Sequence, residues 1–331
     1  MSTTKKEVFS RDIIKLKDID ATIDKICKKL KADVNQVLRR QGGVIGVSGG
    51  IDSAVTLAIA TKAFGPEKLF AVMLPEKDSS PDSKEFAQKI CKKFGVKVIE
   101  ENISGALDGF QCYQRRDEAV KNVIPEFNPA TDKMKIGIPT ELIKKNLPAV
   151  FYVTVIFADG TEKSARLPMA EYLQIVAASN FKQRCRMSML YYHAEALHYA
   201  VLGTPNKHEV QQGFFVKYGD GGADVMPIGN LYKTQVYEIA RHLGVPDEII
   251  NRTPTTDTYS AEQTQEEFFY QMPFEDMDLL WYGWENEYTP EEVAPAMGLS
   301  VEEVIKVFRN FERKMKTTDY LRRAPIHDYP C

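Results

Sequence analysis

The hexapeptide Ser48-Gly49-Gly50-Ile51-Asp52-Ser53 has the residue types of a phosphate-binding turn. It follows the short apolar run Gly43 to Val47 and precedes a stretch with a continuous apolar face, so it lies where a strand becomes a helix. Two adjacent glycines let backbone N–H groups close on an anion at the positive end of the helix, and Ser48 and Ser53 add hydroxyl donors. Phosphate is the natural occupant of such a turn.

Asp52 decides what kind of phosphate this turn can hold. A carboxylate repels phosphate oxygens unless a Mg²⁺ ion bridges the two. The sequence has neither the GxxxxGK[ST] pattern with its phosphate lysine nor GxGxxG followed by an acidic residue about 20 positions later, so kinase and dehydrogenase functions lose support. The turn predicts a metal-bound nucleotide; the alternative is a plain glycine turn in which Asp52 only favours the helix N-terminus.

Several other short motifs follow along the chain. They are Ser79-Ser80-Pro81-Asp82-Ser83, Arg184-Cys185-Arg186-Met187, Gly203 to Glu209, Lys217 to Asp224, Pro227-Ile228, Leu231 to Val236, Pro254-Thr255-Thr256-Asp257 and Gln263-Thr264. The Ser48 to Ser53 turn resembles the signature of the N-type ATP pyrophosphatases, which cleave ATP between the α- and β-phosphates. The other motifs, in the same order, resemble NAD synthases of the ammonia-dependent type. The resemblance covers residues 20 to 105 and 180 to 280.

This resemblance implies ATP-dependent amidation of deamido-NAD. A carboxylate oxygen of the substrate attacks the α-phosphate, pyrophosphate leaves with Mg²⁺, and ammonia converts the acyl-adenylate to NAD and AMP. The expected substrates are therefore ATP, deamido-NAD and ammonia, and the expected cofactor is Mg²⁺. Glutamine-dependent relatives carry a long amidase domain upstream, whereas only about 40 residues precede the turn here, which favours free ammonia; a separate glutaminase partner stays open.

The resemblance also assigns roles to individual residues. Those expected to bind ATP are Gly46, Val47, Ser48, Gly49, Gly50, Ile51, Asp52, Ser53, Thr204, Lys233 and Thr255. Asp52 and Glu209 would hold Mg²⁺, and Lys233 would stabilise the leaving pyrophosphate. Those expected to bind the nucleotide or dinucleotide substrate are Arg184, Lys217 and Asp224.

Asp52, Lys233 and Asp220 are the candidate catalytic residues, with Asp220 positioning ammonium or accepting its proton. Each assignment has a plainer alternative. Glu209 could be only a charge at a helix start, Lys233 a solvated lysine, and Asp220 a turn former between glycines. The family shows His-Lys-Arg or Tyr-Lys-Arg near its C-terminus, whereas this chain has Leu321 where lysine is expected. A related adenylating ligase acting on another carboxylate therefore stays open, as does a non-catalytic nucleotide-binding regulator.

The elements that must position these residues alternate between helix and strand. Apolar periodicity predicts helices at 18 to 40, 51 to 64 and 81 to 94, and strands at 43 to 47, 68 to 74 and 96 to 100. This βαβαβ succession predicts an α/β fold, an open parallel sheet with helices on both faces, whose ligands lie at the carboxyl ends of the strands. A helix at 183 to 199, a strand at 200 to 203 and a helix at 232 to 243 should continue it.

Two regions depart from that alternation. Residues 105 to 178 form an insertion or lid containing a hairpin, residues 150 to 167, whose Asp159-Gly160 predicts a type I′ turn. The last 50 residues are helical, and Ser300 to Glu303 form a capping box that opens a helix running to Lys316. We therefore expect a synthase domain at 1–280, with the insertion at 105–178, and a C-terminal helical extension at 281–331 packed on the same domain.

Composition limits location and partners. The chain has 331 residues and a formal net charge of −3, which gives no global attraction to nucleic acid or an anionic membrane. Its five cysteines, Cys27, Cys91, Cys112, Cys185 and Cys331, lack a CxxC pair, a pattern typical of reduced thiols. No signal-peptide or membrane-spanning apolar run is found, so we expect a cytoplasmic protein. A homodimer is implied by the family resemblance alone.

Overall fold

The computed structural model describes residues 6–138, 150–254, 259–261, 264, 270 and 272–327. Its centre is a parallel four-stranded sheet in the order β3-β2-β1-β7. The strands are β1 (Gly43–Gly46), β2 (Leu69–Met73), β3 (Lys97–Glu100) and β7 (Ala200–Leu202). The chain leaves β1 toward β2 on one side and returns as β7 on the other, so the strand order reverses at β1. Ligands of open α/β sheets bind at this kind of reversal, beyond the carboxyl ends of the strands.

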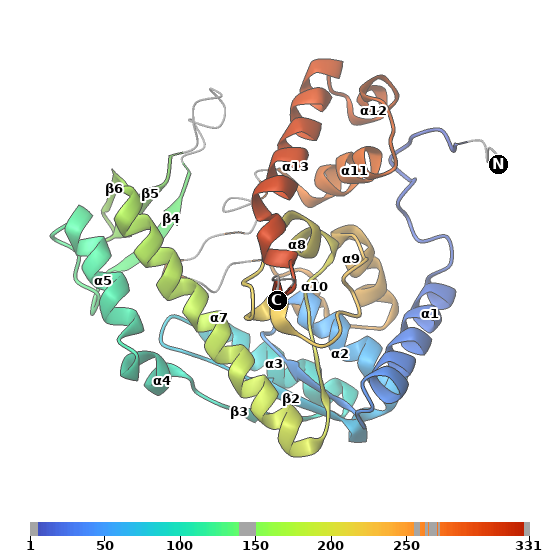
Figure 1. Ribbon diagram of the computed structural model, residues 1–331, viewed down its shortest axis with the longest axis horizontal. Coiled ribbons are helices and arrows are strands. Elements are labelled where there is room, and N and C mark those ends of the chain that lie inside the picture. Colours follow the sequence, from blue (N-terminus) through green and yellow to red (C-terminus); the bar gives the residue numbers. More distant parts are fainter. Residues whose placement is uncertain are drawn as a thin grey trace.

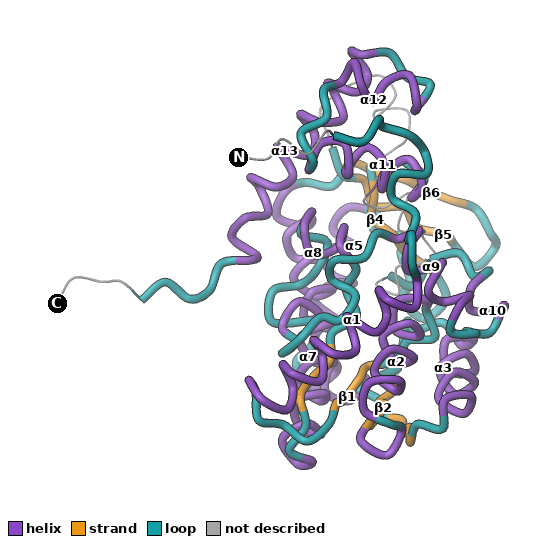
Figure 2. Tube along the Cα trace, turned by 90° about the vertical axis from the view of Figure 1, so that its right-hand side faces the viewer, coloured by secondary structure: helices purple, strands orange, loops and turns teal. Residues whose placement is uncertain are grey.

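Helices cover both faces of this sheet (Figures 1 and 2). One face packs against α1 (Ile19–Ala32), α2 (Ile51–Phe64), α3 (Pro81–Phe94) and α9 (Lys233–His242). The other face packs against α7 (Met169–Leu197) through Met187, Leu190 and Ala194. Residues of β1 and β2 are buried on both faces, as parallel sheets require. The predicted fold class is confirmed.

Most local predictions near the first turn are confirmed. α2 and α3 have the predicted bounds, and Gly95 ends α3 in the left-handed conformation. The helix predicted over 18–40 is instead α1 followed by a π-helix, η1 (Asp33–Val37). Two further short helices are η2 (Pro66–Lys68), which precedes β2, and α10 (Asp247–Ile250), which follows α9.

α7 is much longer than the helix predicted from residue 183. It has 29 residues and begins at Met169, so it runs through the end of the segment predicted as an insertion at 178. The prediction failed because apolar and polar residues are mixed around the whole circumference of α7, which faces the main sheet along one part and a second sheet along another.

This second sheet is antiparallel, in the order β4-β5-β6. Its strands are β4 (Lys133–Gly137), β5 (Tyr152–Ile156) and β6 (Glu162–Arg166), and α4 (Ser104–Gly109) and α5 (Cys112–Val123) precede it. The hairpin formed by β5 and β6 was predicted, but the third strand of this sheet, β4, was not. The type I′ turn is wrong: of Asp159 and Gly160 only Gly160 has positive φ, and the N–H of Gly160 donates to the carbonyl of Phe157. A three-residue loop of this kind needs glycine at its last position only.

Three helices close the described chain: α11 (Phe274–Glu285), α12 (Pro290–Met297) and α13 (Val301–Arg322). The capping box of Ser300 and Glu303 is confirmed, although α13 runs six residues beyond Lys316. The domain boundary expected between 280 and 281 falls inside α11. An apolar cluster joins these helices to Phe9, Ile13 and Tyr232, so they pack on the rest of the chain.

Two further observations concern membrane spans and cysteines. Within the described ranges, the model has no helix that is both long enough and apolar enough to span a bilayer. Cys27, Cys91, Cys112 and Cys185 are free thiols. Cys331 lies outside the described residues.

Candidate active site

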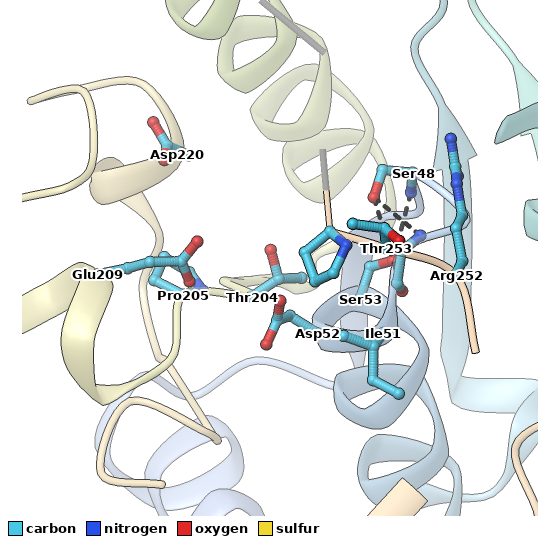
Figure 3. A pocket seen from close by; sticks show the side chains of 12 residues that line it. Ser48, Ile51, Asp52, Ser53, Thr204, Pro205, Glu209, Asp220, Arg252 and Thr253 are labelled. Carbon is cyan, nitrogen blue, oxygen red and sulfur yellow. Dashed lines mark hydrogen bonds between the residues drawn. The ribbon is translucent and has the colours of Figure 1, made fainter. Parts of the chain in front are cut away.

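The turn between β1 and α2 forms one wall of a small cavity (Figure 3). The Ser48 hydroxyl accepts a hydrogen bond from the Gly50 N–H at 3.3 Å, and the Ser53 hydroxyl donates to the Gly50 carbonyl at 2.9 Å. Gly49 has φ of 77° and packs so closely that a Cβ there would lie 2.5 Å from the Ser83 carbonyl oxygen. Gly50, the N-cap of α2, has no side chain to cap the helix, so the first N–H groups of α2 are available to an anion.

Glu209 reaches the same cavity from α8 (Lys207–Gln212). Its carboxylate accepts from the Asn206 N–H at 2.8 Å, and the Asn206 side chain accepts from the N–H groups of His208 and Glu209. Asn206 also donates to Asp52 Oδ1 at 3.4 Å. The plainer interpretation of Glu209 as a helix-start residue is thus correct, yet its carboxylate also lines the cavity.

Lys233 is the first residue of α9 and is fully buried. Its Nζ lies 2.5 Å from Asp52 Oδ2, so it is not a solvated lysine. Burial alone would lower the pKa of Lys233, but the carboxylates of Asp52 and Glu209 outweigh burial and raise it above its ordinary value. The side chain therefore carries a positive charge beside Asp52, but it does not line the small cavity, so its contact with phosphate stays a prediction.

Asp52 and Glu209 are two carboxylates, and among the described residues a single lysine, Lys233, balances their charge. Burial and the neighbouring Asp52 raise the pKa of Glu209 to about 8, although Lys233 opposes this. A cation held between Asp52 and Glu209 would relieve that cost, and Mg²⁺ commonly uses one or two carboxylates together with substrate phosphates. Within the described part of the chain, no three His, Cys, Asp or Glu side chains are grouped to hold a metal by themselves. The residues present thus fit Mg²⁺ bound jointly with a nucleotide.

A second, larger cavity adjoins the first. The volumes are about 150 Å³ and about 840 Å³, and four residues line both: Ser48, Thr204, Glu209 and Asp220. Gly46 and Val47 line the larger one, as do Phe151, which directly precedes β5, and Tyr172 of α7. Together they offer the size of a small-molecule site. Figure 3 shows Glu209 and Asp220 on one side of the small cavity, Ser48 and Arg252 on the other, and Asp52 between them.

Asp220 is both a turn former and a cavity residue. It begins the short helix η3 (Asp220–Gly222), and its Oδ1 accepts from the Val216 N–H at 2.9 Å. Burial raises the pKa of Asp220 to about 6, against the opposing effects of that hydrogen bond and of Arg186. A carboxyl with this pKa can exchange a proton near neutral pH.

Three residues predicted to bind substrate lie outside the lining of both cavities. Arg184 donates to the Lys217 carbonyl at 3.1 Å, and Lys217 Nζ donates to the carbonyls of Tyr320 and Arg323 at 3.0 and 2.7 Å. Asp224 accepts from the Tyr191 hydroxyl and the Val201 N–H. Their substrate roles stay predictions. Thr255 lies outside the described residues.

Other residues at the site were not predicted. Arg252 lines the small cavity and donates to the Ser83 hydroxyl at 3.1 Å, and Thr253 lies beside it. The only signal was the adjacent Pro254-Thr255-Thr256-Asp257 motif. Asn206 was visible in the Gly203 to Glu209 motif but received no role.

A buried ionic cluster beside the larger cavity was also missed. Lys182 Nζ lies 3.0 Å from Glu76 and 2.6 Å from Asp78, and Arg116 pairs with Asp78 as well. The Tyr113 hydroxyl donates to Glu76 at 2.6 Å. This cluster joins the loop after β2 to α5 and α7. Glu76 and Ser79 of that loop line the larger cavity.

The fold and the site together define a Rossmann-like α/β protein of the ATP pyrophosphatase type. The model of the family described as NAD synthase matches residues 22–136 and 151–325. The chain belongs to the NAD synthase family. The expected insertion at 105–178 lies within the matched ranges, apart from residues 137–150.

Curated relatives agree with this assignment. An NH(3)-dependent NAD(+) synthetase of Rhizobium meliloti is 44% identical over 319 residues, which are 96% of this chain and 94% of the relative. The NH(3)-dependent NAD(+) synthetase of Thermotoga maritima is 30% identical over 278 residues, covering 84% of this chain and 92% of the relative. The chain is therefore an enzyme, a ligase of NAD biosynthesis.

Solved structures agree on the fold. The NMN synthetase of Francisella tularensis has a TM-score of 0.64 at 21% identity, covering 94% of this chain and 98% of that one. An NH3-dependent NAD synthetase of Campylobacter jejuni has a TM-score of 0.60 at 21% identity, covering 94% of this chain and 99% of that one.

Proposed function

We propose that this enzyme amidates deamido-NAD with ammonia at the expense of ATP, through an acyl-adenylate, and releases AMP and pyrophosphate. The residue assignment depends on one observation. Asp52 and Glu209, from two separate helices, line the small cavity beside the Ser48 to Ser53 turn, and the buried Lys233 from a third helix pairs with Asp52. These residues lie at the reversal of strand order, where α/β folds bind nucleotides.

Each part of the site then has a task in the reaction. The N–H groups at the start of α2 and the hydroxyls of Ser48 and Ser53 bind phosphate oxygens. Lys233, next to Asp52, stabilises negative charge as it develops on pyrophosphate, and Arg252 adds a second cation on the side of the small cavity opposite Glu209. As ammonia attacks the acyl carbon and AMP leaves, Asp220 accepts the proton that the new amide nitrogen loses.

Asp52 and Glu209 are the residues that would hold Mg²⁺. The cation supplies charge neutralisation of the phosphates when it is bound. Support for this assignment is geometric: two carboxylates line the small cavity, and the nearby Lys233 pairs with only one of them, Asp52.

A homodimer is the proposed assembly. Support comes from the apolar side chains that α7 exposes: Met169 is 69% exposed, Leu173 56% and Tyr192 62%. Light scattering on the purified chain tests this, since a monomer at micromolar concentration would overturn it. The cytoplasmic location predicted from the cysteines stays a prediction, as does ammonia without a glutaminase partner.

The function is tested by incubating the enzyme with ATP, Mg²⁺, ammonium and deamido-NAD. We expect equal amounts of NAD, AMP and pyrophosphate. Nicotinic acid mononucleotide and an unrelated pyridine carboxylate serve as competing acids, because Leu321 stands where the family has lysine. Pyrophosphate release with another acid and none with deamido-NAD would contradict the proposed substrate.

A further inference from the structure

Asp278 is a fully buried carboxylate that lines neither cavity. It belongs to α11, which lies over α8 and α9 in both views of the molecule (Figures 1 and 2). Burial of a carboxylate away from water is costly unless hydrogen bonds compensate it. The hydrogen-bond partners of Asp278 therefore indicate its role.

One set of partners is the N-terminus of α9. Asp278 Oδ2 accepts from the Thr234 N–H at 2.7 Å and from the Thr234 hydroxyl at 2.6 Å, and Oδ1 accepts from the Lys233 N–H at 3.3 Å. A carboxylate from another helix thus supplies the acceptors that the first turn of α9 needs. Because α9 begins at Lys233, these bonds fix the backbone from which the Lys233 side chain extends to Asp52.

The other partner is His208 on α8. His208 Nε2 lies 2.6 Å from Asp278 Oδ1, and both side chains are fully buried. On the far side of the ring, Nδ1 lies 3.2 Å from the amide nitrogen of Gln212, whose oxygen accepts from Lys314. That amide nitrogen is a donor, so Nδ1 accepts a hydrogen bond from it. Nε2 therefore carries the ring proton and donates a hydrogen bond to Asp278. His208 directly precedes Glu209.

Glu285 repeats the pattern two turns further along α11. It pairs with Lys207 at 2.8 Å and accepts from Gln211 of α8 at 3.0 Å, and it accepts from the hydroxyl of Tyr232, the N-cap of α9, at 2.9 Å. Positions seven apart lie on the same face of a helix. One face of α11 thus holds the first turns of α8 and α9 together at two levels.

We propose that Asp278 and His208 are positioning residues that hold Glu209 and Lys233 in the geometry required by metal-bound ATP. α8 has only six residues and cannot be rigid by itself, so an external tie must fix Glu209 relative to Lys233. The proposal rests on the assignment of Glu209 to the metal and Lys233 to the triphosphate. It gives the C-terminal helices a part in the reaction although they supply no residue to the small cavity within the described chain.

The test compares Asp278→Asn with Asp276→Asn. Asp276 lies on the same helix but is 39% exposed and pairs with Arg11 at the surface. In the Asp278→Asn variant, the new amide would present its N–H either to His208 or to the N-terminus of α9, both of which need an acceptor. Loss of a group that orients a ligand-bearing residue costs roughly 10- to 100-fold in metal affinity or activity. We expect a drop of that size in kcat and in Mn²⁺ affinity with ATP present, measured by electron paramagnetic resonance, and wild-type values for Asp276→Asn.

A second pair of variants separates positioning from loss of fold. His208→Gln keeps an N–H for Asp278 and should recover much of the Mn²⁺ affinity that His208→Leu loses, with similar melting temperatures for both. Equal Mn²⁺ affinity in wild type, Asp278→Asn and His208→Leu would overturn the positioning role. Absence of ATP-dependent Mn²⁺ binding in the wild-type enzyme would instead sink the proposed metal site, so the two failures are distinguishable.

Discussion

Two buried groups of charges differ in how completely they are balanced. In the cluster of Glu76, Asp78, Arg116 and Lys182, each carboxylate lies against a cation or a hydroxyl donor. At the nucleotide turn, Lys233 pairs with Asp52, while Glu209 accepts a hydrogen bond from a neutral backbone N–H. Both groups border a cavity, but the carboxylates of the first are balanced by their own cations, whereas Glu209 of the second is not.

The pKa values follow this difference. Lys182 and Arg116 overcome burial and lower the pKa of Asp78 below its ordinary 3.8. Burial and Asp52 instead raise the pKa of Glu209 to about 8. A balanced cluster fixes structure, whereas an unbalanced one at a cavity is prepared for an additional charge from a ligand. Variants in and around the two clusters test this contrast.

The largest expected effect is on stability. Lys182→Met leaves the buried carboxylates of Glu76 and Asp78 without one of their cations, and removing one partner of a buried ion pair costs about 3–5 kcal/mol. Urea unfolding measures the loss. Adding Glu76→Gln to Lys182→Met should recover part of it, because the uncompensated charge is then gone. A Lys182→Met enzyme as stable as wild type would refute the balanced-cluster interpretation.

The matched change at the other cluster should affect catalysis. Lys233→Met removes the cation that stabilises the leaving pyrophosphate, and loss of one such group lowers kcat roughly 10²- to 10³-fold. Pyrophosphate release under saturating ATP is the measurement. Suppose that Lys233→Met is destabilised as much as Lys182→Met but keeps its kcat per folded molecule. Both clusters would then be structural, and the contrast between them would be wrong.

Arg252 offers a smaller effect at the edge of the unbalanced cluster. Arg252→Gln removes a charged donor from the small cavity, which is worth about 1.5–3 kcal/mol, or roughly 10- to 100-fold in the KM for ATP. Arg241→Gln is the control, since Arg241 is exposed and packs over Tyr237. An unchanged KM for ATP in Arg252→Gln would exclude a triphosphate contact.

The smallest effect is a change in pH dependence. Asp220, with a pKa of about 6, must be deprotonated to accept a proton, so activity should fall as pH drops through 6 and be retained above it. Rates are compared at equal free ammonia, because ammonia itself titrates. Asp220→Asn should be slower and show no decline of its own near pH 6; an unchanged acidic limb in that variant would remove Asp220 from the proton transfer.

The balanced cluster also shows which features could not be predicted from the sequence, namely contacts between residues far apart in the chain. The turn at Ser48 and the bounds of α2 and α3 were predictable because glycine turns and apolar runs are local signals. Lys182 was invisible, because its partners Glu76 and Asp78 lie on a loop far away in sequence. Asp278 was missed for the same reason, since a helix in the C-terminal region caps one that begins at Lys233.

The candidate site residues also differ in whether local sequence signals were enough to predict them. Asp52 was interpretable from local chemistry, whereas Glu209 and Lys233 needed the family resemblance, and the structure brings all three together. Arg184, Lys217 and Asp224 came from resemblance alone, and in this single chain each one binds backbone or a neighbouring side chain outside the cavities.

The central claim is that Asp52 and Glu209 bind the cation of metal-bound ATP. Asp52→Asn keeps the shape of the side chain but removes its charge and leaves a single oxygen to accept from Lys233 or Asn206. The most direct measurement is Mn²⁺ affinity of the folded enzyme in the presence of ATP, together with pyrophosphate release. We predict that both fall at least roughly 10-fold per folded molecule. The melting temperature should fall as well, because the buried Lys233 loses its ion-pair partner. An Asp52→Asn enzyme with full Mn²⁺ affinity and full pyrophosphate release would contradict the claim.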